Sequence, residues 1–202
     1  KNEEIFKEYD KIEAIQNTDK SGNLIYEQNV LKVQKDGKYG LIDFDGKVDE
    51  KVLARYEAEA YFYRAYNYWV LTTYFGDVPY ITDELNVEAP DVYRGRDPRA
   101  TVIANITKDL EDHYLNLPEH IVAASAEFGR VSQCAALALL SRIYLYNEMY
   151  AEAVNAAERA MANSYHQLYS TGNPDKDYVN LFNYTGRASR NALNKETLLA
   201  FV

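Results

Sequence analysis

The 202-residue chain is long enough for one sizeable hydrophobic core or two small domains. Its formal net charge of −9 and pI of about 4.9 argue against a nucleic-acid-binding protein, which would carry a basic surface. A single cysteine, Cys134, excludes an intramolecular disulfide, and its alanine and leucine neighbours predict a buried, inert thiol. Tyrosine is unusually frequent, at 19 residues, which suits helix packing, hydrated interfaces and sugar stacking alike.

Residues 1–48 are predicted to form a small β segment. β-Prone residues lie on both sides of the sequence Lys35-Asp36-Gly37-Lys38. Asp-Gly between two such runs is a strong hairpin signal, because both residues tolerate a positive φ. A second pair, Asp45-Gly46, is interpreted as a turn and not as a calcium loop, since no terminal glutamate ligand follows it.

This N-terminal segment resembles a single WG-type β repeat. The resemblance rests on Tyr9-Asp10-Lys11-Ile12 and on the run from Lys35 to Asp43, in which Tyr39 replaces the usual tryptophan. A lone repeat unit buries little apolar surface, so it is expected to be poorly stable by itself. The change of pattern after it predicts two domains, residues 1–48 and residues 49–202.

A long helix is predicted over about residues 50–75. Its second half is rich in aromatic residues and has apolar residues on nearly every face, which predicts packing on several sides. Glu57, Glu59 and Arg64 argue against a membrane span there. Arg64, in the middle of the aromatic residues, is interpreted as a structural ion pair or an aromatic stack.

Three further helices are predicted over 98–116, 132–147 and 150–163. Asp97-Pro98 is interpreted as the N-cap and first helical residue of the first of them. The other two have tetratricopeptide spacing, which predicts a packed pair with its close contact at Ala153 and Ala157. The loop over 76–96 precedes these helices.

The aromatic helix also carries a family resemblance. Ala58-Glu59-Ala60, Phe62, Arg64-Ala65, Tyr68, Leu71 and the run Phe75-Gly76-Asp77-Val78-Pro79 resemble the signature helix of the SusD/RagB family, the surface glycan-binding lipoproteins of Bacteroidetes. Residues 129–161 resemble the helical pairs of the same family. The resemblance covers about residues 52–202. It implies a mainly α fold of tetratricopeptide-like helical pairs, which is incomplete at its C-terminus. A small β-hairpin segment precedes this fold at the N-terminus.

The resemblance implies a function as well. Such a protein is a non-catalytic, glycan-binding component of a SusC/SusD-type outer-membrane uptake system, which delivers oligosaccharides to a TonB-dependent transporter. It would be a surface-exposed lipoprotein of the outer membrane, with membrane contact only through a lipid anchor. The chain starts at Lys1 and shows neither a signal peptide nor a lipid-attachment cysteine near it, so we expect it to be a processed, truncated or engineered piece, with a fusion of two unrelated segments as a further alternative. The alternative is a tetratricopeptide-like protein-interaction scaffold without glycan binding.

No catalytic constellation, metal site or cofactor motif is evident in the sequence. His113, His120 and His166 lack metal-ligand spacing. Candidate ligand-binding residues are aromatic: Tyr80 and Tyr93 lie in the predicted loop, where binding residues concentrate. Trp69, in the helix, is interpreted as core, with a ligand platform as its alternative role.

Overall fold

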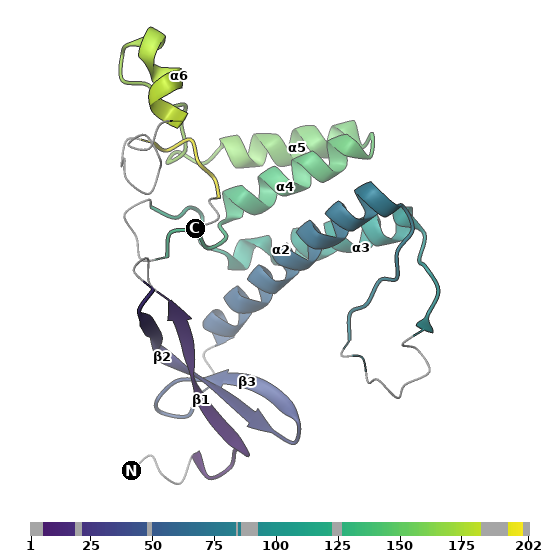
Figure 1. Cartoon of the computed structure of the whole chain (residues 1–202), viewed down its shortest axis with the longest axis vertical. Coiled ribbons are helices and arrows are strands. Elements are labelled where there is room, and N and C mark those ends of the chain that lie inside the picture. The colour runs from purple at the N-terminus through teal and green to yellow at the C-terminus, as the bar shows by residue number, and fades with distance from the viewer. Residues whose placement is uncertain are drawn as a thin grey trace. The chain divides into compact units, whose positions relative to one another are not determined.

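The computed structural model describes residues 6–18, 22–47, 50–83, 85, 93–122, 127–182 and 194–199. The strands are β1 (Lys11–Thr18), β2 (Leu24–Lys35) and β3 (Lys38–Ile42), and the helices are α2 (Glu50–Phe75), α3 (Arg99–His113), the short 3-10 helix η2 (Tyr114–Asn116), α4 (Gln133–Tyr146), α5 (Tyr150–Met161) and α6 (Pro174–Phe182) (Figure 1). The predicted mainly α fold with a small N-terminal β segment is confirmed.

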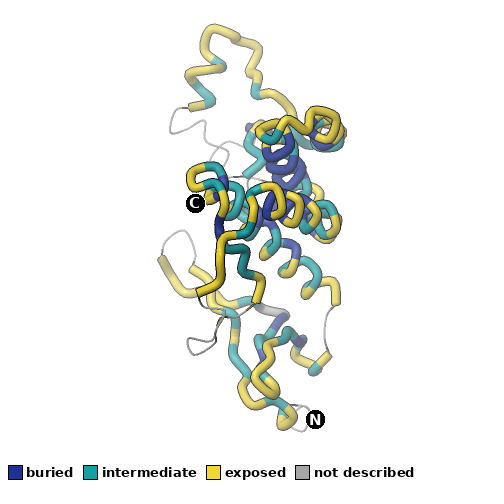
Figure 2. Tube along the Cα trace, turned by 90° about the vertical axis from the view of Figure 1, so that its right-hand side faces the viewer, coloured by how far each residue is buried: buried dark blue, intermediate teal, exposed yellow. Residues whose placement is uncertain are grey.

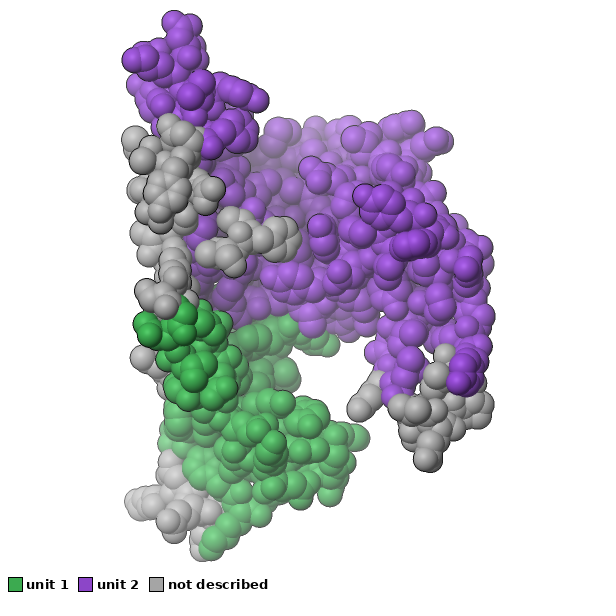
Figure 3. Space-filling model, in the orientation of Figure 1, with its two compact units in different colours: residues 1–57, 202 green, residues 58–201 purple. Residues whose placement is uncertain are grey.

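The chain divides into two compact units, residues 1–57 and residues 58–201, and the division falls within α2 (Figure 3). The first unit contains the three strands, and the second contains most of α2 and all the later helices. That residues 1–48 and 49–202 are separate domains stays a prediction.

The sheet of the first unit is antiparallel, in the order β1-β2-β3. The predicted hairpin is confirmed: Asp36 and Gly37 have φ values of 50° and 75°, and Lys35 pairs with Lys38 across the turn. The carboxylate of Asp10 accepts a hydrogen bond from the backbone N–H of Asp36 at 2.8 Å. Pairing of β1 with β2, which the sequence did not predict, therefore brings a third strand to the turn.

The second unit has its core along α2, α3, α4 and α5, as the buried residues in Figure 2 show. In α2 the fully buried positions form one stripe, made by Ala58, Phe62, Ala65 and Thr72. Packing on several sides was predicted, but Tyr74 and Phe75 at the end of the helix are 78% and 68% exposed. A tyrosine tolerates this because its hydroxyl remains hydrated while its ring covers apolar surface.

Helices α4 and α5 pack side by side as an antiparallel pair, as predicted (Figure 1). Ser132 caps α4 by accepting a hydrogen bond from the N–H of Ala135 at 3.3 Å. On α5, Ala153 is buried as predicted and Ala156 is fully buried, whereas Ala157, the other predicted contact residue, is half-buried. The buried small residues of α5 are therefore three apart, on one stripe of the helix.

Candidate functional site

The junction between α2 and α3 is built by the residues that follow α2. Gly76 has a φ of +69°, the left-handed conformation that ends a helix, and its N–H bonds to the carbonyl of Thr72 at 3.1 Å. Asp77 then accepts a hydrogen bond from the N–H of Arg99 at 2.8 Å, so it caps the start of α3 from outside that helix. The predicted cap was wrong. Pro98, and not Asp97, occupies the N-cap position, and its side chain makes no capping hydrogen bond.

The loop between the two helices is closed at its base. Val78 and Asp97 form an isolated antiparallel bridge, in which the N–H of Asp97 bonds to the carbonyl of Val78 at 3.0 Å. The carboxylate of Asp97 accepts hydrogen bonds from the N–H of Tyr80 at 2.7 Å and from Arg94 Nη2 at 3.3 Å. Asp97 is thus committed to the loop base, which is why it does not cap α3. Residues 84 and 86–92 of this loop lie outside the described residues.

A tyrosine of α2 fixes the outgoing side of the loop. The hydroxyl of Tyr68 accepts a hydrogen bond from the N–H of Ile81 at 2.8 Å and lies 3.3 Å from the carbonyl oxygen of the same residue. Its ring meets the ring of Tyr80 edge-on, with 4.8 Å between centroids. The first residues of the loop are therefore attached to α2 as well as to Asp97.

A charged cluster joins α2 to α3 beneath this loop. Arg64 Nη2 lies 2.5 Å from Asp109 Oδ2, and the hydroxyl of Tyr80 donates to the same oxygen at 3.1 Å. The guanidinium also stacks over the ring of Tyr61, 4.6 Å from its centroid, so the interpretation of Arg64 as an ion pair and aromatic stack is confirmed. Burial, together with the charge of Asp109, raises the pKa of Tyr80 to about 12.

The three predicted ligand-binding residues have different environments. Tyr93 is 92% exposed. Tyr80 is half-buried, and its ring and hydroxyl are both engaged with α2 and α3. Trp69 is also half-buried against the helical core, and its indole Nε1 is buried without a hydrogen-bond partner among the described residues. The ring of Tyr93 is therefore open to solvent, whereas the other two rings mainly pack against the protein.

Sequence reasoning missed the three aspartates that organise this region, Asp77, Asp97 and Asp109. Asp77 carried a signal, because it belongs to the Phe75-to-Pro79 run that matched the family. Asp97 was noticed but given the wrong partner. Asp109 carried no signal, since a carboxylate on an amphipathic helix normally faces solvent.

The remaining polar candidates have structural partners. His113 stacks on Tyr61 with 4.1 Å between centroids, and His120 stacks on Tyr165 at 4.2 Å. Cys134 is buried as predicted, and burial raises the pKa of its thiol. Among the described residues, no group of three or more His, Cys, Asp or Glu side chains is arranged to hold a metal ion. No helix within the described ranges has the length and hydropathy of a membrane span.

Comparison with known proteins covers this same region. Residues 39–145 match the model of the SusD-like family described as "Starch-binding associating with outer membrane". The match runs from β3 to α4 and includes α2, α3 and the loop over residues 76–96 between them, which is called the clamped loop below.

Individual relatives agree with the family match. SusD-like protein P25 of Formosa agariphila is 26% identical over 160 residues, which are 79% of this chain and 27% of that protein. A SusD-like protein from Bacteroides fragilis has the same fold at 24% identity and a TM-score of 0.64, over 75% of this chain and 28% of its own. A laminarin-binding SusD-like protein is similar at 26% identity and a TM-score of 0.55, over 69% and 30% of the two chains. The chain thus spans about a quarter of the length of the curated relative.

Proposed function

This chain belongs to the SusD-like family, and from that membership we propose that it is a non-catalytic, glycan-binding component of an outer-membrane nutrient uptake system. The family description joins starch binding to the outer membrane, and one structural neighbour is named as laminarin-binding. Delivery of oligosaccharides to a TonB-dependent transporter, and attachment as a surface lipoprotein, belong to the same proposal. The non-catalytic role rests on the family description, which names binding only.

The observation that carries the proposal is the clamped loop within the matched span. Its base is fixed by the Val78–Asp97 bridge and by Tyr68, and it presents the exposed ring of Tyr93 next to Arg94 and other polar residues. Sugars bind to aromatic rings through their C–H faces and to polar side chains through their hydroxyls. An exposed ring beside polar side chains meets both needs. The half-exposed edges of Tyr80 and Trp69 are the other proposed contacts.

Calorimetry against starch- and laminarin-derived oligosaccharides tests the proposal. Tyr93→Ala should weaken binding by about threefold to tenfold, the worth of one ring contact, without changing the melting temperature. Tyr178→Ala is the matched control, because Tyr178 is a 75% exposed tyrosine on α6, outside the loop. Equal loss of affinity in both variants would contradict the assignment of Tyr93. Release of reducing sugar by the purified chain would contradict the non-catalytic role.

A protein-interaction role is the second candidate, and the turn between α4 and α5 favours it. Leu145, Tyr146 and Tyr150 there are each more than half exposed, and Met149 is 37% exposed. Apolar clusters of this kind are typical of interaction surfaces. With a purified TonB-dependent transporter immobilised on a sensor surface, Tyr146→Ala and Tyr150→Ala should weaken capture of this chain and leave oligosaccharide binding unchanged. Tight capture with no oligosaccharide binding would favour the scaffold function by itself.

A further inference from the structure

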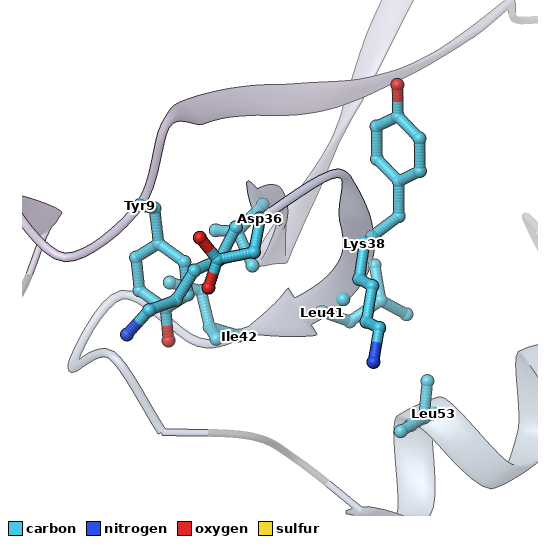
Figure 4. A pocket seen from close by; sticks show the side chains of 10 residues that line it. Tyr9, Asp36, Lys38, Leu41, Ile42 and Leu53 are labelled. Carbon is cyan, nitrogen blue, oxygen red and sulfur yellow. The ribbon is translucent and has the colours of Figure 1, made fainter.

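We propose that the N-terminal unit holds a second saccharide site, in a cavity of about 390 Å³ between one face of the β2–β3 hairpin and the first turn of α2 (Figure 4). The choice of a sugar as ligand rests on the proposed glycan-binding function. All residues that line this cavity lie within residues 1–57, so it is separate from the clamped loop. Its volume is at the lower end of the range of small-molecule sites, about 300–1,000 Å³, and suits one or two sugar rings.

The floor of the cavity is apolar and owes its depth to a glycine. Val33 pairs with Gly40 across the hairpin, and Val33 and Ile42 are 4% and 1% exposed. A Cβ at Gly40 would lie 3.6 Å from Val33 Cγ2, so any longer side chain there would extend over the floor. Leu53 of α2, which is 39% exposed, adds an apolar wall. This surface matches the C–H face of a pyranose ring.

The rim of the cavity is polar and carries both charges. Lys35 and Lys38 are direct cross-strand partners, and like charges in such positions repel. Lys35 lies 3.5 Å from Glu8, whereas Lys38 has no ion-pair partner among the described residues. In Figure 4 Lys38 extends across the opening toward Leu53, while the ring of Tyr9 stands beside Ile42. Asp36, in the turn, contributes a carboxylate to the lining.

These groups fit a neutral sugar better than an anionic one. The carboxylate of Asp36 accepts hydrogen bonds from hydroxyl groups, and the ammonium of Lys38 donates to them. Lys35 and Lys38 are balanced in number by the carboxylates of Glu8 and Asp36, so the site has little net charge. A ligand with an apolar face and several hydroxyls satisfies the floor and the rim together.

Backbone amide NMR of the full chain, titrated with maltose, tests this site separately from the loop. We expect saturable shifts at residues 33–42 that persist in the Tyr93→Ala variant. Asp36→Asn and Lys38→Ala should each weaken this binding by about tenfold, the worth of one hydrogen bond to a charged group. Asparagine keeps the turn, because Asn-Gly is as well suited to positive φ as Asp-Gly. Lys47→Ala is the control, since Lys47 is an exposed lysine of the same unit that does not line the cavity.

The outcomes distinguish the cavity of the N-terminal unit from the clamped loop. Shifts at 93–97 without shifts at 33–42 would overturn the second site and leave the proposed function intact. Shifts at 33–42 alone would support the second site and contradict the role of the loop. Equal weakening by Lys47→Ala would also overturn the second site, because the contact would then be a general effect of charge. An absence of shifts throughout, with maltose and with laminarin-derived oligosaccharides, would overturn both.

Discussion

The α4–α5 pair and the α2–α3 pair are held together by different forces. Between α4 and α5 the contact is made mainly by apolar and small side chains, with Leu140, Ile143 and Ala156 fully buried, and the Ser141 hydroxyl adds a hydrogen bond to the carbonyl of Ala153 at 3.0 Å. Between α2 and α3 the contact includes the Arg64–Asp109 ion pair, and Glu59 of α2 holds Arg130, before α4, through two hydrogen bonds of 3.0 Å. The first pair therefore depends on how much apolar surface is buried, and the second depends also on where individual carboxylates lie.

The two kinds of contact contribute differently to stability and to geometry. Apolar packing has no preferred direction and stabilises a scaffold efficiently. Hydrogen bonds and ion pairs add little net stability but fix geometry, since a partner left unpaired is costly. Among the polar contacts of this region, those of Asp77, Asp97 and Tyr68 hold the base of the clamped loop.

The largest expected effect is in the apolar pair. Leu140→Ala should lower the free energy of unfolding by about 2–5 kcal/mol, because a fully buried leucine is lost and a cavity remains. Denaturant unfolding measures the change. Leu145→Ala, in the same helix but 58% exposed, is the control and should change stability by less than about 1 kcal/mol. Similar losses in the two variants would mean that α4 does not bury the predicted face.

A second test concerns the closest approach of the two helices. Ala156→Leu should destabilise by about 1–3 kcal/mol, because no space exists for the added atoms at a fully buried position. Ala157→Leu should have a smaller effect, since its half-buried site lets the side chain turn toward solvent. Thermal melting of both variants shows which of the two substitutions lowers the melting temperature more. The reverse order would restore Ala157 as the contact that tetratricopeptide spacing predicted.

Removing a charge from the α2–α3 pair should cost less. Asp109→Ala should destabilise by about 1–2 kcal/mol, because Arg64 and the Tyr80 hydroxyl both lose their partner in a site that water partly reaches. Asp112→Ala is the matched control: Asp112 pairs with Lys108 on the exposed face of the same helix, and such pairs contribute about 0.5 kcal/mol or less. A double-mutant cycle with Arg64→Ala isolates the pair, and a coupling of zero would contradict its role.

The smallest effect is the response of Tyr80 to pH. Its folded pKa of about 12 exceeds the usual value of about 10, so its contribution to stability is complete below pH 10 and is lost as the pH rises toward 12. Absorbance titration of the wild type minus Tyr80→Phe should show this ionisation. In Asp109→Asn the pKa of Tyr80 should fall but stay above 10, because burial is the larger cause and the carboxylate adds to it. An unchanged pKa in that variant would mean that Asp109 does not act on Tyr80.

The sequence by itself determined the elements that local chemistry specifies. Asp36-Gly37 predicted the hairpin because both residues accept positive φ, and Gly76 marked the end of α2 for the same reason. The spacing of apolar and small residues predicted α4 and α5 and their pairing. Tyr93 was selected as a loop aromatic, and the structure leaves its ring exposed.

Only the tertiary structure decided the partners of the polar side chains. Asp77, Asp97 and Asp109 look alike in the sequence, yet one caps α3, one closes the loop and one pairs with Arg64. Tyr80 was equivalent to Tyr93 as a loop aromatic until Asp109 and Tyr68 were found to engage it. Local propensity reports on a residue and its near neighbours, whereas these contacts join segments that only folding brings together.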